Sequence, residues 1–211
     1  MNITRCALGL SVILSGCALI RGYSVIEYVE TLRGKPLKPY IQCQCIDSLH
    51  VVSIKEQNQQ APKFRLVGSD TVSVVDGFRV MYAFSSRDYP FAKLMAEQSS
   101  PEKYDSDKEK CKSNLDKAAK QSRLAQATDT TTNGFEVFGT ENDSIGKGNV
   151  LGQYLIFSNR DNAIITVYFF NQGEQNHAFK NAHEFKTLRA AFINSYTSCI
   201  AKRNQETPLS L

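Results

Sequence analysis

The last third of the chain contains the segments that most constrain its fold. GQYLIFS (152–158) and AIITVYFFN (163–171) are rich in β-branched and aromatic residues and are joined by the short polar sequence NRDN. Such a pair predicts two neighbouring antiparallel strands. FEVF (135–138) is a third β-prone segment. After the strands, apolar residues recur at every third or fourth position between 178 and 204, which predicts an amphipathic C-terminal helix.

The first half contains four shorter β-prone segments: LHVVSI (49–54), FRLV (64–67), VSVV (72–75) and FRVMYAF (78–84). Asp76-Gly77 separates the last two segments and predicts a tight hairpin turn. In FRVMYAF every second residue is large and apolar, so we expect one face of this strand to lie in the core.

Between these two groups of strands the sequence predicts two helices. RDYPFAKLMAEQ has Asp88 as a candidate N-cap and Pro90 in the first turn. SDKE (106–109) has the form of a capping box before a longer helix that reaches about Ala127, and DTTTNG (129–134) is expected to end it. The predicted fold class is α+β, with an antiparallel β-sheet packed by helices. Its expected order is strands, two helices, strands and a C-terminal helix.

The N-terminus has the composition of a secretory signal. Arg5 precedes a nearly uncharged apolar run that is shorter than the roughly 20 residues needed to span a bilayer. Leu14-Ser15-Gly16-Cys17 follows it and resembles the lipobox of bacterial lipoproteins. This resemblance implies cleavage before Cys17, lipidation of its thiol (a palmitate-type anchor), and attachment to a membrane. Ala18 follows the cysteine instead of an aspartate, so the resemblance implies the outer membrane, with the domain facing the periplasm.

These features divide the chain into four parts. We expect residues 1–16 to be the signal peptide and 17–39 to be the lipidated N-terminus and tether. Residues 40–204 are expected to form a single α+β periplasmic domain, and 205–211 a loose tail.

The remaining cysteines predict two disulfides. Cys6 leaves with the signal, and four cysteines stay in an oxidising compartment: Cys43, Cys45, Cys111 and Cys199. A bond between Cys43 and Cys45 would close a strained ring, so we expect one of them to bond Cys111 and the other Cys199. Both pairings remain open. A metal or redox site is the weaker interpretation, because Cys111 and Cys199 stand alone and Cys-x-Cys is not the Cys-x-x-Cys of redox motifs.

No motif for catalysis, a cofactor or a metal stands out. The three histidines do not form a His-Glu-x-x-His site. Asp105, Asp107 and Glu109 lack the glycine and the spacing of a calcium loop, and acidic residues at a helix start are favoured by the helix dipole. The formal net charge of +4 includes no dense basic run, so a nucleic-acid partner is not expected. We therefore expect a non-enzyme without cofactor.

A binding protein is the function that these features favour. The polar, glycine-rich stretch 139–152 contains Glu141, Asp143 and Lys147 and is a candidate partner-binding loop. In general kind the chain resembles the small disulfide-bearing immunity lipoproteins that protect bacteria from their own secreted antibacterial toxins. This resemblance implies a toxin as protein partner. A structural or assembly lipoprotein of the envelope and a carrier of a small apolar ligand are the alternatives.

Overall fold

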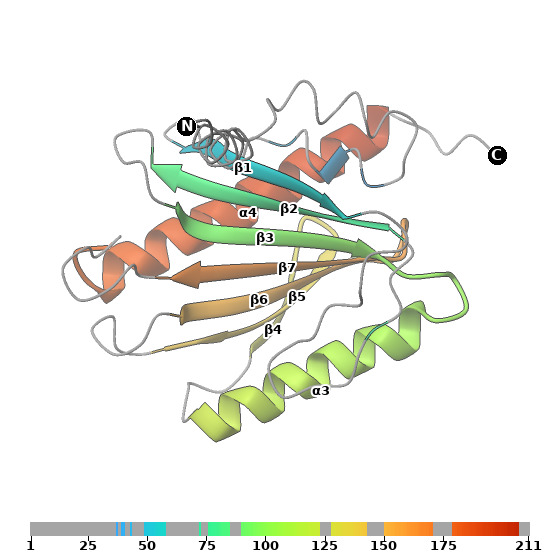
Figure 1. Cartoon of the computed structure of the whole chain (residues 1–211), viewed down its shortest axis with the longest axis horizontal. Coiled ribbons are helices and arrows are strands. Elements are labelled where there is room, and N and C mark those ends of the chain that lie inside the picture. Colours follow the sequence, from blue (N-terminus) through green and yellow to red (C-terminus); the bar gives the residue numbers. More distant parts are fainter. Residues whose placement is uncertain are drawn as a thin grey trace, which may run out of the picture.

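A seven-stranded antiparallel sheet forms the centre of the molecule, with a long helix on each face (Figure 1). The structure is a computed structural model. It describes residues 37, 39–40, 43, 49–57, 72, 76–84, 90–122, 128–142, 150–170 and 179–206. The predicted α+β class with an antiparallel sheet is therefore confirmed.

The sheet consists of two meanders that meet in its centre. Its order is β1-β2-β3-β7-β6-β5-β4, and every neighbouring pair is antiparallel. The strands are β1 (Leu49–Gln57), β2 (Asp76–Phe84), β3 (Pro90–Gln98), β4 (Thr128–Thr132), β5 (Phe135–Glu141), β6 (Val150–Ser158) and β7 (Ala163–Phe170). β3 and β7 join the meanders, while β1 and β4 are the edges of the sheet.

Most of the predicted strands are confirmed. Segments 49–54, 78–84, 135–138 and 152–158 lie within β1, β2, β5 and β6, and the segment beginning at 163 forms β7. The sequence NRDN forms the turn between β6 and β7, in which Asn162 has a φ of 51°. Residues 64–67 and 73–75 lie outside the described residues.

The predicted helix RDYPFAKLMAEQ is wrong, because its described part forms strand β3. Leu94 pairs with Val167 and belongs to the cluster under α4, whereas the next residue, Met95, pairs with Thr166 and faces the other way. Both side chains are buried. A strand covered on both faces has a continuous apolar run that periodicity does not distinguish from a helix. The predicted N-cap, Asp88, lies outside the described residues.

The predicted turn at Asp76-Gly77 is also wrong. Both residues belong to β2, and Gly77 pairs with Gln57 on one side and with Glu97 on the other. Gly77 therefore lies at the start of β2, between β1 and β3, and not in a turn. The expected burial of one face of β2 is borne out by Val80 and Tyr82, which are 1% and 2% exposed.

Two helices are described. α3 (Tyr104–Ser122) lies between the meanders in the sequence, and α4 (Ala182–Glu206) closes the described chain. α3 begins two residues before the predicted Ser106, and its described part ends at Ser122. Residues 123–127, which include the predicted end at Ala127, lie outside the described residues, and TDTTT after them is strand β4. The predicted C-terminal helix is confirmed. Asn181 begins it, since its side chain accepts a hydrogen bond from the amide of Glu184 at 2.9 Å.

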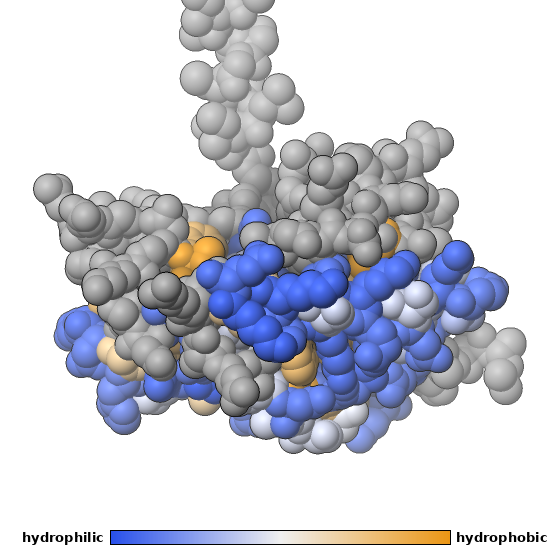
Figure 2. All heavy atoms as spheres, turned by 90° about the horizontal axis from the view of Figure 1, so that it is seen from below, coloured by the Kyte–Doolittle hydropathy of each residue, from blue (hydrophilic) through white to orange (hydrophobic). Residues whose placement is uncertain are grey.

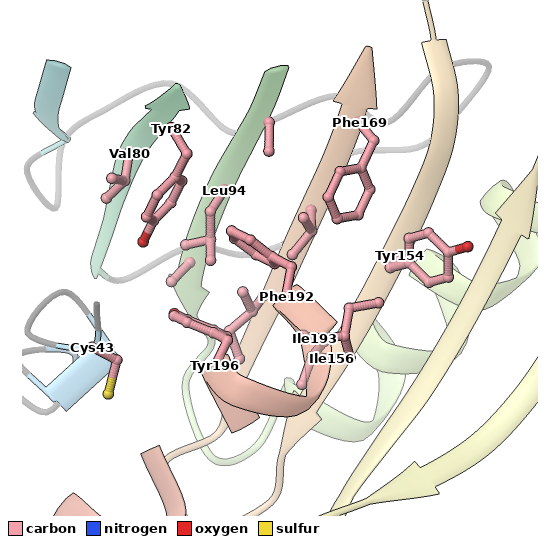
Figure 3. Packing of buried hydrophobic residues seen from close by; sticks show 14 of the residues in the cluster. Cys43, Val80, Tyr82, Leu94, Tyr154, Ile156, Phe169, Phe192, Ile193 and Tyr196 are labelled. Carbon is pink, nitrogen blue, oxygen red and sulfur yellow. The ribbon is translucent and has the colours of Figure 1, made fainter. Parts of the chain in front are cut away.

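The two helices cover opposite faces of the sheet. On β6, Tyr154 and Ile156 belong to the large cluster with α4, whereas Leu155 and Phe157 belong to a smaller cluster with α3. Figure 3 shows side chains of α4, among them Phe192, packed against the strands in the larger cluster. The described surface on the α3 side is mostly hydrophilic (Figure 2). Within the described residues, no helix is long and apolar enough to cross a membrane.

Two disulfides were expected, and one is found among the described residues. Cys43 is bonded to Cys199 of α4, with a Cα–Cα distance of 5.6 Å. Cys111 is a buried free thiol. It lies on α3 in the smaller cluster, whereas Cys43 lies in the larger cluster on the other face, so the sheet separates them. The prediction that Cys111 is bonded is therefore wrong, and Cys45 lies outside the described residues.

Candidate functional site

Half of the predicted site residues fall in the described part of the chain, namely Cys43, Cys111, Glu141 and Cys199. Cys17, Asp143 and Lys147 lie outside it, so the lipidation site and most of the candidate loop stay predictions. Glu141 is described, and it is the last residue of β5. Its surroundings lead to the candidate site.

Glu141 is held by two partners inside the fold. It accepts a hydrogen bond from the hydroxyl of Tyr154, and it forms an ion pair with Arg189 of α4. The guanidinium of Arg189 also lies over the Tyr154 ring, 5.4 Å from its centroid. Burial, together with the hydrogen bond to Glu141, raises the pKa of Tyr154 well above its ordinary value. The carboxylate of Glu141 thus connects β5 to α4, and it is not an unpaired charge on a loop.

Two glycines make room for the ring of Tyr154. A Cβ atom at Gly139, which pairs with Tyr154 across the strands, would overlap the ring. A Cβ atom at Gly152 would lie 3.1 Å from the opposite edge of the same ring. Tyr154 lies at the margin of the large cluster, with its hydroxyl pointing away from Phe169 (Figure 3).

A groove of about 260 Å³ lies beside this network, between β4 and α4. One wall is formed by the side chains of Thr128, Thr130 and Thr132, which share the face of β4 that is turned toward α4. Val137 of β5, Tyr154 of β6 and Ile193 of α4 supply apolar surface to the groove. We call this site the β4–α4 groove.

Polar contacts connect the β4–β5 hairpin to α4 at both ends of the β4–α4 groove. At the Thr132 end, the side-chain amide nitrogen of Asn133 donates to the Thr197 hydroxyl at 2.9 Å and to the main-chain carbonyl of Asn194 at 3.1 Å. At the other end, Thr128 pairs with Gly139, two residues before Glu141 and its ion pair with Arg189. The groove is therefore bounded by contacts that fix its length.

The β4 strand beside the groove is the edge of the sheet. Its first four residues are exposed, and its pairing with β5 has no bulge. Its sequence, TDTTT, contains neither lysine nor proline, which are common means of blocking an edge strand. The outer side of β4 thus presents main-chain groups that another strand can reach.

The opposite face of β4 is occupied by charged contacts. Asp129 pairs with Lys112 of α3 at 3.3 Å, and Lys112 together with Lys108 also pairs with Glu136 of β5. Burial acts to raise the pKa of Glu136, but the hydrogen bonds from the two lysines outweigh it and hold this pKa below its ordinary value. These charges connect α3 to the sheet.

The buried polar residues under α3 do not form a second candidate site. Burial, reinforced by the carboxylates of Glu97 and Asp107, raises the pKa of the Cys111 thiol far above its ordinary value. Cys111 is therefore protonated and a poor nucleophile. Asp107 is buried and accepts a hydrogen bond from Ser99 at 2.9 Å, whereas Asp105 and Glu109 are exposed. No group of three metal-ligating side chains occurs among the residues described.

The β4–α4 groove was not predicted from the sequence, because TDTTT was assigned to the end of a helix. A signal was available. Asn133-Gly134 between two β-prone segments is the strongest short-range indicator of a hairpin, and both residues have positive φ, 51° and 82°.

A scan against models of protein families and a search of curated proteins return no match to this chain.

Proposed function

We propose that this chain is a lipid-anchored periplasmic binding protein of the outer membrane, and that it is an immunity lipoprotein that binds and neutralises a secreted antibacterial toxin. The observation that carries the proposal is the open β4 edge beside the β4–α4 groove. A recessed surface next to an accessible strand suits recognition of another protein chain. The lipobox-like residues Leu14 to Cys17 supply the anchor.

The attachment of the N-terminal segment supports this arrangement. Tyr40 is fully buried; its hydroxyl donates to Asp161 at 2.7 Å, and its carbonyl accepts from Tyr196 at 2.9 Å. Three residues later, Cys43 is bonded to Cys199. The chain that follows the predicted lipid is thus fastened to α4 and to the β6–β7 turn. A disulfide of this kind is typical of proteins that fold in an oxidising compartment.

The lipid anchor is tested by metabolic labelling with an alkyne analogue of palmitate. The full chain is expected to incorporate the label, and Cys17→Ser is expected to lose it because the acceptor thiol is gone. Cys6→Ser is the matched control, since this cysteine lies in the segment removed with the signal. Equal labelling of the Cys17→Ser variant and the parent would contradict the proposal.

The partner is tested with the secreted antibacterial proteins of the same strain. Each is purified and its affinity for the full chain is measured in detergent. Specific complexes of standard interface size have dissociation constants in the micromolar range or tighter, and one toxin is expected to reach this range. A chain that binds none of them, and whose deletion instead weakens the envelope in pure culture, would contradict the toxin-binding proposal.

A further inference from the structure

We infer that β4 accepts an extended segment of the partner as an added antiparallel or parallel strand, and that this segment places a glutamate side chain in the β4–α4 groove. The inference rests on the proposed function in one respect, namely that the partner is a protein. It adds the mode of binding and the chemistry of the bound residue.

The edge of β4 provides the main-chain part of this recognition. β4 is a regular five-residue strand, and among the described residues it is paired on one side only, by β5. An extended peptide beside it gains main-chain hydrogen bonds that do not depend on its sequence. At a rise of about 3.4 Å per residue, β4 has room for about five residues of the partner.

Alternation along the added strand provides the specificity. Neighbouring strands share their faces, so every second side chain of the partner lies on the face of Thr128, Thr130 and Thr132, next to the groove. The volume of about 260 Å³ exceeds that of a cavity of about 150 Å³ that holds a benzene molecule. The groove therefore takes one or two side chains, not a large ligand.

The composition of the groove favours glutamate among those side chains. Val137 and Ile193 offer apolar surface for its two methylene groups. The hydroxyls of Thr128 and Thr132 and the side-chain amide of Asn194 offer hydrogen-bond donors for its carboxylate, whereas the Thr130 hydroxyl already donates to the Val137 carbonyl. Arg189 also lines the groove; its charge is paired with Glu141, but its buried Nε has no hydrogen-bond partner within the described structure. Glu141 is the acid nearest to Arg189, and it is bound to both Arg189 and Tyr154. Arg189 can meet a second carboxylate, because a guanidinium has five N–H donors.

The test uses synthetic acetylated heptapeptides of alternating threonine and valine whose central residue is glutamate, glutamine or lysine. Their binding to the full chain in detergent is measured by fluorescence anisotropy. The glutamate peptide is expected to bind about tenfold more tightly than the glutamine peptide, as one charge-assisted hydrogen bond predicts. Every second peptide nitrogen can be N-methylated in two patterns. Only the pattern that blocks the N–H groups facing β4 is expected to abolish binding.

Two variants of β4 form a matched pair. Thr130→Glu puts a negative charge in the groove and is expected to reverse the preference from the glutamate to the lysine peptide. Thr131→Glu puts the same charge on the other face of the same exposed strand and is expected to leave the preference for glutamate unchanged. Because both positions are exposed, both variants are expected to fold.

Three outcomes overturn the inference: no peptide binds, all three bind equally, or both β4 variants change the preference alike. The inference is also overturned if no peptide binds and the chain instead forms a dimer that Thr130→Glu abolishes. A second copy of this chain is then the occupant of the edge. A toxin that binds Thr130→Glu as tightly as the parent overturns the inference and leaves the proposed function intact. Glutamate-selective peptide binding without any toxin partner supports the inference and contradicts the proposed toxin.

Discussion

Tyr154 connects the core of the protein to the candidate site. Its ring packs on Phe169, with a centroid distance of 5.9 Å, and lies under the guanidinium of Arg189. Its hydroxyl binds Glu141. The sequence identified Tyr154 as part of a β-prone segment and Glu141 as a polar loop residue. Their contact could not be predicted, because it depends on the pairing of β5 with β6 and on the docking of α4, both of which join residues distant in the chain.

Gly139→Ala is expected to lower the free energy of unfolding by about 1–3 kcal/mol, because the added methyl group overlaps the Tyr154 ring. Urea denaturation measures the change. If the ring is the cause, the same substitution in a Tyr154→Ala background is expected to cost much less. Equal costs in both backgrounds would show that the ring is not what excludes the methyl group.

Among the strands and helices, most segments were predicted from local pattern, and two strands were misread, each for its own physical reason. β3 is a central strand buried on both faces, so its sequence lacks the alternation of a half-buried strand. β4 has only exposed or partly exposed side chains and offered no apolar pattern at all. The identity of β3 depends on its neighbours in the sheet, which local sequence does not contain, whereas the hairpin signal Asn133-Gly134 that follows β4 is local.

The β4–β5 hairpin is expected to depend on the amide of Asn133 for its attachment to α4. Asn133→Asp keeps the size and the tolerance for positive φ but removes the donor to Thr197 and Asn194. The expected loss is about 1 kcal/mol in the free energy of unfolding. Asn162→Asp is the matched control, since Asn162 has the same φ of 51° in another turn. A loss no larger than that of the control would contradict the role of these hydrogen bonds.

The attachment of α3 to the sheet is expected to weaken in acid. Because the pKa of Glu136 is lowered in the folded state, its contribution to stability is present above its ordinary pKa of about 4.3 and is lost as the pH falls through the folded value. Glu136→Gln is expected to remove part of the acid dependence of the free energy of unfolding. Parallel curves for the parent and the variant between pH 6 and pH 3 would contradict this assignment.

At the scale of the whole molecule, the disulfide joins the beginning of the described chain to its last helix. It spans 156 residues, and closing so long a loop is worth about 5 kcal/mol in the chain-entropy model. Cysteine count and compartment predicted that Cys199 is bonded. They could not predict that Cys111 is free, because this depends on which face of the sheet each helix covers.

Cys43→Ser, Cys199→Ser and the double variant are expected to be destabilised by similar amounts, since each removes the same bond. Peptide mapping without reduction is expected to recover Cys43 linked to Cys199, and Cys111 is expected to react with iodoacetamide only after denaturation. A linkage that contains Cys111, or additive costs in the double variant, would contradict this arrangement.

The fold as a whole is expected to lose stability in alkali. Burial raises the pKa of Tyr40, Tyr104 and Tyr154 in the folded state. In the unfolded chain tyrosine ionises near pH 10, so stability is complete below that pH and falls as the pH rises above it. Urea titrations at pH 8 to 11 measure this slope, and Tyr154→Phe is expected to make it shallower. A constant free energy of unfolding across this range would contradict the burial of these hydroxyls.

Survival in competition measures whether this chain protects the cell from a toxin. A strain that lacks this chain is grown with its toxin-secreting parent, and the ratio of survivors is measured with and without complementation. The deletion strain is expected to be killed, the full chain is expected to restore its survival, and a competitor without the toxin gene is expected not to kill it. Equal survival of the deletion strain and its parent, with the toxin secreted, would contradict the claim that this protein protects the cell by binding a toxin.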